Sequence, residues 1–380
     1  MSVQTQQSSI DRHYSSQISP PLYNKGEIDL RELLTGLWYS KWLIIATTLS
    51  FTIAAAIFAI NSQEWWSSKA KVGPAQAYDM AAYRQQVKQF QPVFNIYQDD
   101  GTVLVSEELD NLIDSEVLFK RFIDAFNSNN NKRNFLESSK EFQQFKKNLN
   151  TELDEDELTK ARHALYSQWF GNITIKAENP DSELTPYNIG FQSTSSESSY
   201  LLLVNYIKTI KTKTHQDALN NLEAIVSAKK NELTQQKRIL EVQAKNRLTI
   251  EADRAKYALS IAKAAGVTSP IQTNDSRELF GIDMGSKAIA AKVEALNSIE
   301  NLSIIEPRLQ QIDAKLQMLK TLSVERSIDF QTFRLLEDVE QPITRDKPKR
   351  TLITVIGTLI GGMLGVVIAL ICFVFRREQD

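Results

Sequence analysis

Apolar residues are concentrated in two uninterrupted runs, one near each end of the chain. Trp42 to Ile60 contains 19 residues without a charged side chain, and Thr351 to Phe375 contains 25. At 1.5 Å per residue, helices over these runs would be about 28 Å and about 38 Å long, enough to cross a hydrocarbon core. The pattern therefore predicts two transmembrane helices, over residues 42–60 and 351–375.

A cleaved signal peptide is the alternative for the first run, and a buried core helix is the alternative for the second. About 40 residues precede the first run and no small-residue cleavage site follows it, which disfavours a signal peptide. A helix that is apolar on all sides over 25 residues is too long for the core of this chain. Tryptophans at both edges of the first run are typical of membrane interfaces: Trp38, Trp42, Trp65 and Trp66.

The segment between the runs, residues 61–350, is polar and is predicted to form one water-exposed, mostly helical domain. Alternation of apolar and polar residues predicts strands over 65–74, 172–177 and 187–192, and the return segment 329–342 predicts another. Residues 79–163 have helical composition, interrupted at Gly101 and by the polar run NSNNN. The prediction is therefore a small group of strands combined with many helices.

The ends of the chain are predicted to lie on one side of the membrane, because two crossings return the chain to its starting side. Residues 1–41 form a Ser- and Gln-rich disordered tail followed by a helix along the membrane surface over 27–40, and residues 376–380 form a second tail. The terminal flanks carry five Lys or Arg and the loop flanks carry seven. Taken literally, this count favours the opposite orientation, but the loop is far longer than the ~60 residues for which charge bias is decisive, so the count is discounted. The large domain is predicted to lie outside the cytoplasm.

A stretch without helix breakers makes one very long helix the strongest prediction within the domain. Neither Gly nor Pro occurs between Gly190 and Gly266, and Thr194 to Glu197 has the pattern of a capping box. A helix over 195–265 would be about 100 Å long. Apolar residues spaced by three and four are expected to form its packing seam: Leu219, Leu222, Val226, Leu233, Leu240, Ile250, Tyr257 and Ile261.

Polar residues interrupt that seam, so a half-exposed helix beside a shorter partner fits better than a free two-stranded coiled coil. The expected partner is residues 287–323, which keep a good spacing of three and four. Pro307 should either begin a new helix within the partner or kink it. Residues 266–286 are expected to form the turn-rich tip between the two helices.

Composition and motifs disfavour an enzyme. The net charge is −2 over 380 residues, which argues against a nucleic-acid-binding surface. Cys372 is the only cysteine, the three histidines (His13, His163 and His215) are expected to be solvated, and the acidic run at 152–157 lacks the spacing of a calcium loop. Phosphate-loop, zinc-protease and C-x-x-C motifs are absent. We therefore predict no catalytic residue, no metal site and no cofactor.

The second apolar run contains the strongest local motif. Gly357, Gly361 and Gly365 recur every four residues with Gly362 beside them, which gives two overlapping G-x-x-x-G units. One helix face without side chains lets another helix approach its backbone closely. The expected partner is the first span, a sister subunit or another membrane protein.

Several short motifs together resemble the Wzz-type polysaccharide co-polymerases, regulators of O-antigen chain length in Gram-negative bacteria. E-I-D-L at 27–30 precedes L-W-x-x-K at 37–41, W-x-S-x-A stands at 66–70, and A-L-S-I-A-K-A-A-G at 258–266 ends the long helix. A sparse proline segment with a basic end leads to L-I-G-G-M-x-G at 359–365; it contains Pro342, Pro348, Lys349 and Arg350.

This resemblance implies an α+β, mostly helical protein of the bacterial inner membrane. Two transmembrane helices would flank a periplasmic domain with an α/β base near the membrane and a very long extended helix, and both termini would be cytoplasmic. The resemblance also implies a homo-oligomeric ring that works with the Wzy polymerase and leaves room for contact with the growing polysaccharide. Pro342, Pro348, Lys349 and Arg350 would form its juxtamembrane motif. On this interpretation the protein is not catalytic and sets how many repeats the polymerase adds.

Other classes of protein fit less well. A capsule-type tyrosine-kinase co-polymerase needs a cytoplasmic phosphate-loop domain after the second span, where only five residues follow Phe375, so it would require a separate kinase. A two-span sensor would need a signalling module, and no terminal segment is long enough for one. A chain-length regulator of another Wzy-dependent glycan, such as enterobacterial common antigen or capsule, stays open as the alternative.

Overall fold

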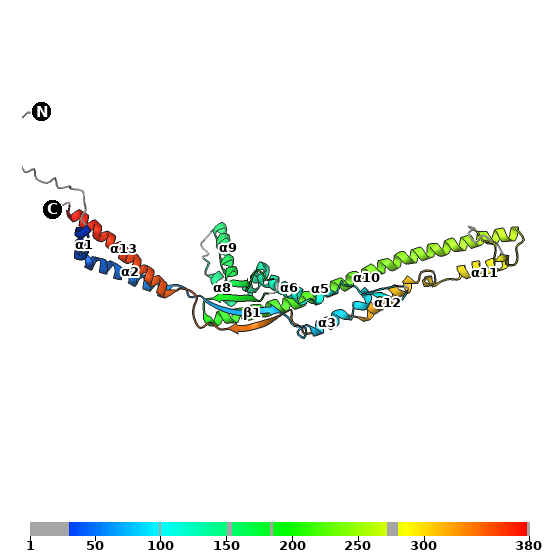
Figure 1. The fold of residues 1–380 in the computed structure, drawn as a ribbon, viewed down its shortest axis with the longest axis horizontal. Helices are drawn as coiled ribbons and strands as arrows, with labels where there is room; N and C mark the ends of the chain where they lie inside the picture. Colours follow the sequence, from blue (N-terminus) through cyan, green and yellow to red (C-terminus); the bar gives the residue numbers. More distant parts are fainter. Residues whose placement is uncertain (1–29, 99, 150–153, 183–184, 272–279, 378–380) are drawn as a thin grey trace, which may run out of the picture. The chain divides into compact units, whose positions relative to one another are not determined.

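The computed structural model describes residues 30–98, 100–149, 154–182, 185–271 and 280–377 (Figure 1). Its described residues form two compact units, one containing residues up to Gln63 together with those from Lys347 onward, and the other containing Glu64–Asp346. The predicted disordered tail, His13, most of the E-I-D-L motif and part of the helical tip lie outside the described residues.

The first unit is helical. It contains α1 (Leu30–Tyr39), α2 (Lys41–Asn61) and α13 (Arg350–Arg377). Both predicted apolar runs form helices that are long and apolar enough to cross a membrane, with mean hydropathy 2.3 for Lys41–Asn61 and 2.6 for Arg350–Phe375. α2 and α13 lie side by side along their lengths.

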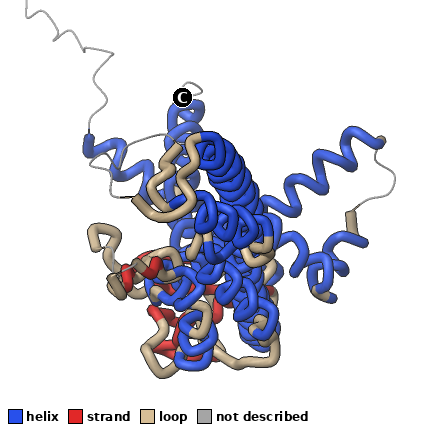
Figure 2. Tube along the Cα trace, turned by 90° about the vertical axis from the view of Figure 1, so that its right-hand side faces the viewer, coloured by secondary structure: helices blue, strands red, loops and turns tan. Residues whose placement is uncertain are grey.

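The second unit is built around a four-stranded antiparallel sheet with the strand order β4-β5-β1-β6. Its strands are β1 (Trp66–Pro74), β4 (Ile173–Ala177), β5 (Tyr187–Ser193) and β6 (Phe333–Glu340). All four predicted strands are therefore confirmed. The two ends of the domain sequence meet in this sheet, because β1 begins soon after α2 and β6 pairs with it shortly before α13. Figure 2 shows the strands gathered in one region among many helices.

Among the described residues between β1 and β4, the chain forms seven shorter helices and a small hairpin. The helices are α3 (Ala81–Lys88), α4 (Gln91–Phe94), α5 (Asp110–Ile113), α6 (Ser115–Asn127), α7 (Asn129–Ser138), α8 (Lys140–Lys147) and α9 (Glu155–Asn172). The predicted interruptions are confirmed, since α6 ends within the NSNNN run. At Gly101, however, the chain forms a hairpin of β2 (Ile96–Tyr97) and β3 (Val103–Leu104), which the sequence did not indicate. Gly101 has φ +86° at its turn, a conformation that glycine adopts readily.

The long helix α10 (Ser196–Ala264) contains 69 residues, which corresponds to about 104 Å, and confirms the predicted rod. Its N-cap is Ser195, whose hydroxyl accepts a hydrogen bond from the Ser198 amide at 3.0 Å, so the cap lies one residue later than the predicted Thr194. At the other end, Gly266 has φ +74°, and the Val267 amide donates to the Ala262 carbonyl at 2.9 Å. This bond closes the helix by the Schellman pattern.

The predicted partner of α10 is confirmed, although it forms two helices. α11 (Gly285–Asn297) and α12 (Arg308–Thr321) run back along α10, with a short 3-10 turn at Leu302–Ile304 between them. Pro307 therefore begins a new helix and does not kink an old one. Gly285 has φ +75° and a Cβ there would lie 2.7 Å from the Ser269 carbonyl carbon, so the chain crosses itself closely at this point.

Three hydrophobic clusters occupy successive parts of α10. The base cluster packs the sheet against α6 to α9 and the beginning of α10, and its rings include Trp169, which packs edge-on against Trp65 at 6.5 Å. The middle cluster joins α3, α4 and α5 to α10 and α12. The distal cluster is small and joins α10 to α11 through Ala258, Ala262 and Ile289.

The distal part of the predicted seam is wrong. Ile250, Tyr257 and Ile261 are 52%, 63% and 43% exposed, whereas α10 turns four alanines inward: Ala252, Ala255, Ala258 and Ala262. Alanine permits closer approach of α11 than a branched side chain would, and the larger apolar side chains of this stretch are therefore more exposed. Tyr257 keeps an edge-on contact with Phe280, with 5.7 Å between the ring centroids.

His215 was expected to be solvated, and this expectation is also wrong. Its ring is partly buried and stacks on Phe330 with 4.3 Å between ring centroids, and Nε2 lies 2.9 Å from the Ile328 carbonyl oxygen. His163 is exposed on α9. His215 thus has a packing role between α10 and the segment that leads to β6.

Replacing Tyr83 by Phe should test the middle cluster. The Tyr83 hydroxyl donates to the Ala218 carbonyl at 3.1 Å, and its ring stacks on Phe330. Burial raises the pKa of Tyr83 to about 12, with Arg121 opposing that shift. Losing the buried hydrogen bond should lower the free energy of unfolding by about 1–2 kcal/mol at neutral pH.

The pH dependence gives a second readout of the same substitution. Below pH 10 the phenol is protonated in both the folded and the unfolded chain. Between pH 10 and about 12 the unfolded chain loses this proton first, so the stability contributed by Tyr83 declines as pH rises. Thermal denaturation from pH 8 to 11 should therefore show a steeper alkaline decline for the parent than for Tyr83→Phe. Parallel profiles would contradict the assignment.

Candidate functional site: a glycine-lined helix pair

The glycines singled out in the sequence lie on the side of α13 that faces α2. A Cβ added to Gly361 would lie 2.7 Å from the Phe51 Cβ and 3.1 Å from the Thr48 Cα, and one added to Gly365 would lie 3.1 Å from the Ile44 Cα. A Cβ added to Gly357 would overlap the Ala55 side chain. These three positions therefore have no room for a side chain while the two helices keep this spacing.

Gly362 differs from its neighbours. A Cβ at this position would lie 3.7 Å from the nearest atom, the Thr48 Oγ1, which is an ordinary van der Waals contact. Gly361 and Gly365 are buried and Gly362 is only partly buried. The close contact thus depends on every fourth glycine, as expected for two helices that approach through small residues.

Polar contacts fix the register of the pair. Thr52 Oγ1 and Thr358 Oγ1 are 2.9 Å apart, and Arg350 Nε donates to the Ala59 carbonyl at 3.2 Å near the other end of the contact. A hydroxyl pair inside a membrane helix interface satisfies groups that lipid cannot. The sequence contained a signal for Thr52, since Thr47, Thr48, Ser50 and Thr52 are the hydroxyl residues of an otherwise apolar run, but it did not indicate their partner.

α1 joins the same assembly of helices at the far end of α13. A Cβ on Gly36 would lie 2.5 Å from Cδ2 of Phe373, so α1 also approaches α13 closely. Lys41 Nζ lies 5.0 Å from the centroid of the Trp38 ring, and Trp38 and Trp42 are exposed. The three helices form one packed unit in which a glycine stands at each tight contact.

The four residues of the predicted juxtamembrane motif are divided between the two units. In the second unit, the Pro342 carbonyl accepts a hydrogen bond from Ser196 Oγ at 2.6 Å, which links the end of β6 to the first turn of α10. In the first unit, Pro348 and Lys349 immediately precede α13. The Lys349 carbonyl accepts a hydrogen bond from the Ile353 amide at 3.1 Å, and the Arg350 side chain donates to the Ala59 carbonyl on α2. The functional role of the motif stays a prediction.

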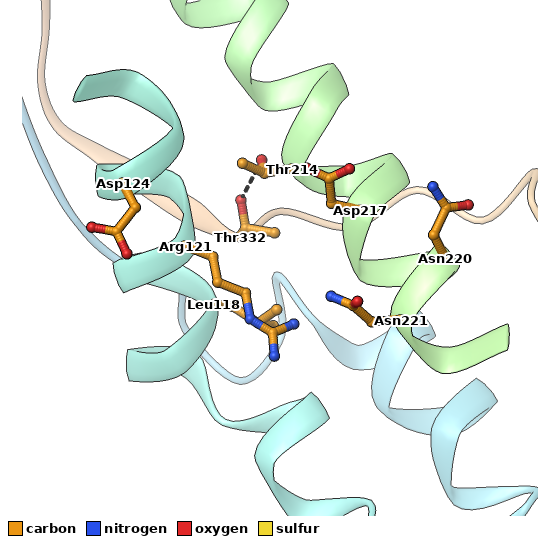
Figure 3. Close-up of a pocket in the computed structure, with 8 residues that line it drawn as sticks. All are labelled: Leu118, Arg121, Asp124, Thr214, Asp217, Asn220, Asn221 and Thr332. Atoms are coloured by element: carbon orange, nitrogen blue, oxygen red, sulfur yellow. Dashed lines mark hydrogen bonds between the residues drawn. The ribbon is translucent and has the colours of Figure 1, made fainter. Parts of the chain in front are cut away.

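A polar cavity of about 410 Å³ lies in the second unit between α6 and α10 (Figure 3). Arg121 on α6 and Asn221 on α10 point toward each other across it, and Thr214 and Thr332 are joined by a 3.1 Å hydrogen bond. The remaining lining residues are Leu118, Asp124, Asp217 and Asn220. Thr214 lines the cavity from the buried stripe of α10.

The chemistry of this cavity is that of a hydrated polar space. It contains amides, carboxylates, hydroxyls and one guanidinium, and it lacks a nucleophile next to a base. Within the part of the chain that the structure describes, no three His, Cys, Asp or Glu side chains are grouped so that they could hold a metal ion. The glycine-lined helix pair is therefore the stronger candidate for the functional site. What its geometry supports is close packing of one helix against another.

Comparisons with known proteins agree with this architecture. The sequence model of the family described as "Wzz: Chain length determinant protein" matches residues 26–124. One relative is an Escherichia coli K12 protein called ferric enterobactin transport protein FepE, 26% identical over 94% of this chain and 92% of its own length. A chain length determinant protein of Shigella dysenteriae is 23% identical over 94% of this chain and 95% of its own length.

Two further similarities concern the glycan and the fold. An Escherichia coli K12 protein called ECA polysaccharide chain length modulation protein is 24% identical over 91% of this chain and 94% of its own. The solved structure of a full-length bacterial polysaccharide co-polymerase superposes with a TM-score of 0.58, at 22% identity, covering 92% of this chain and 99% of that one. This likeness shows a shared fold. Its N-terminal region matches the Wzz model, relatives named chain length determinant proteins align with it along almost their whole lengths, and a solved co-polymerase shares its fold. The chain is therefore similar to the Wzz chain length determinant proteins in sequence and in fold.

Proposed function

We propose that this protein regulates the modal chain length of lipopolysaccharide O-antigen as a non-catalytic, ring-forming partner of the Wzy polymerase. The observation that carries the proposal is the alignment of nearly the whole chain with nearly the whole of relatives named chain length determinant proteins. The two candidate membrane helices and the intervening domain support a bacterial inner-membrane protein with its large domain in the periplasm and both termini in the cytoplasm.

The glycine-lined pair suggests how the spans take part. Gly357, Gly361 and Gly365 hold α13 against α2, so the surface offered to the polymerase or to a sister subunit would be the outer surface of a fixed two-helix unit. Pro342, Pro348, Lys349 and Arg350 would then transmit the position of β6 to α13 through a short connection. The long helix α10 would form the wall of the ring, with its polar outer face toward water or glycan.

Glycan profiling of a deletion strain tests the proposal. Loss of the gene should replace a clustered O-antigen length distribution by a gradual ladder, and the wild-type gene supplied in trans should restore the cluster. A normal O-antigen profile with altered enterobacterial common antigen or capsule would assign the protein to that other glycan instead. Labelling of single cysteines introduced into the 61–350 segment from the periplasmic side would test the proposed orientation.

The name of one relative offers a second candidate, a part in ferric enterobactin transport. Within one chain, the buried glycine contacts leave α2 and α13 too close to enclose a path for a siderophore. Uptake of ferric enterobactin measured in the same deletion strain discriminates the two functions. Unchanged uptake with an altered glycan ladder supports regulation of chain length, and the reverse result supports transport.

A further inference from the structure

A groove of about 760 Å³ lies where the β2–β3 hairpin meets α10 and α12, and we call it the hairpin groove. The residues that line it combine amides, basic groups, rings and aliphatic side chains. They are Phe94, Ile96, Tyr97, Gln98, Lys229, Glu232, Leu233, Gln236, Ile239, Leu240, Gln243, Arg308, Gln311, Ile312 and Lys315. Its volume falls within the range of sites that bind small molecules.

Among the described residues, Lys315 is the cation of this groove for which no ion pair within 4 Å is found, although Glu232 also lines the groove. Its half-buried ammonium donates to the Asn95 carbonyl at 2.6 Å and lies 5.6 Å from the centroid of the Tyr97 ring. Among the described residues, no carboxylate lies within 4 Å of it, so the ammonium is satisfied by neutral groups alone. Burial, and next the nearby Lys229, lowers the pKa of Lys315, and Glu232 opposes that shift in part. An anion entering the groove would relieve that cost.

The other two cations are already neutralised. Lys229 forms ion pairs with Glu232 at 2.9 Å and Glu108 at 3.7 Å. Arg308 pairs with Glu306 at 2.5 Å. Lys315 is therefore the cation of the groove that stays outside these ion pairs, and a single cation suits a ligand with one anionic group better than a polyanion.

The rest of the lining suits a ring rich in hydroxyl groups. Four glutamines supply both donors and acceptors, namely Gln98, Gln236, Gln243 and Gln311. Tyr97 is 40% exposed and offers a flat surface beside Lys315 on which an apolar ring face can rest. The polar cavity of Figure 3 has no aromatic ring, and its one cation shares the space with Asp124 and Asp217.

We propose that the hairpin groove binds a short segment of an anionic saccharide, with the acidic group on Lys315 and a sugar ring against Tyr97. The acidic group can be a carboxylate or a phosphate ester, which share this chemistry. The inference rests on the proposed function, since the natural ligand would be a segment of the regulated glycan. It adds a glycan-contacting site on the domain to the packing role of the helices.

Calorimetric titration of the full-length protein in detergent micelles tests the proposal. Trigalacturonate, glucose 6-phosphate, neutral maltotriose and a hexaglutamate peptide serve as probes. Trigalacturonate or glucose 6-phosphate should bind at least about tenfold more tightly than maltotriose, and which of the two binds identifies the anionic group. Failure of both to exceed maltotriose overturns the proposal. Equal or tighter binding of hexaglutamate also overturns it, because the groove would then be a site for acidic protein segments.

Matched substitutions locate the binding. Lys315→Gln should weaken binding of the acidic saccharide about tenfold, since a charge-assisted contact is lost, while the Gln amide can still donate to the Asn95 carbonyl. Tyr97→Leu should weaken it by a similar factor. The controls are Lys320→Gln, on the exposed face of the same helix, and Tyr78→Leu, at a ring that is 72% exposed outside the groove. Equal losses in the controls would overturn the assignment.

The binding experiment and the deletion experiment test different claims, so either claim can be rejected while the other is kept. Absence of saccharide binding by a protein that does restore the O-antigen length cluster would reject the groove and keep the proposed function. Saccharide binding that depends on Lys315, in a protein whose deletion leaves every glycan profile unchanged, would keep the groove and reject regulation of chain length. Melting temperatures within about 2 °C of the parent show that a variant is folded, and Lys315→Arg, which keeps the charge, should retain binding.

Discussion

Cells that carry the double substitution Gly361→Leu and Gly365→Leu are expected to lose the modal band on a lipopolysaccharide gel while making a normal amount of the protein. At both positions even a single Cβ would collide with α2. A Leu side chain must therefore push the two helices apart, which breaks the Thr52–Thr358 hydrogen bond as well as the glycine contacts. Each helix would still insert, since Leu raises its hydrophobicity.

Single alanine substitutions provide a matched control one residue apart. Gly361→Ala places a methyl group 2.7 Å from the Phe51 Cβ, whereas Gly362→Ala places the same group 3.7 Å from Thr48 Oγ1. Both changes have the same effect on helix propensity and membrane insertion. The modal length should shift in Gly361→Ala and stay the same in Gly362→Ala. An unchanged ladder in the double Leu variant, with expression verified, would reject a role for this packing in chain-length control.

The elements with strong local signals could be predicted from the sequence. The two apolar runs, the breaker-free segment that became α10 and the alternating strands each depend on a pattern of neighbouring residues. The return strand could be placed for the same reason. Pairing β6 with β1 then brings together residues more than 250 positions apart, such as Pro74 and Phe333, and local patterns do not contain that register.

The distal seam of α10 shows where periodicity fails. Large apolar residues at Ile250, Tyr257 and Ile261 have regular helical spacing, yet Ala258 and Ala262 are the ones that contact α11. Hydrophobic spacing identifies an apolar face, but close packing between helices selects small residues. This part of the helix has one stripe of large apolar residues and one stripe of alanines. The sequence contained no local signal for which of the two contacts α11.

The candidate sites were predictable to different degrees. Repeated glycines indicated a packing surface on the second span, and the remaining question was which helix occupies it. The hairpin groove could not be predicted, because Tyr97 and Lys315 are more than 200 residues apart and meet only when α12 folds back along α10. The hairpin itself is two residues long on each side, too short for a reliable strand pattern.

The second large effect should follow from replacing Ala224 by Pro in the middle of α10. Ala224 is exposed, so its side chain makes little contribution to packing. Proline removes the hydrogen bond from residue 224 to the Asn220 carbonyl and its ring collides with that carbonyl, which costs about 3 kcal/mol or more. The middle cluster uses Leu222 before this point and Leu233 after it, so a kink must also separate residues that now share one core.

Thermal denaturation of the full-length protein in detergent measures the loss. A cost of about 3 kcal/mol corresponds to a fall in melting temperature of roughly 6–12 °C for a domain of this size, and Ala224→Gly should lower it by only about 2–4 °C. The glycine control increases backbone freedom at the same exposed site without a ring. If the proline variant melted no earlier than the glycine variant, α10 would tolerate a break there, and its segments on either side of Ala224 would be held by separate packing instead of by one continuous helix.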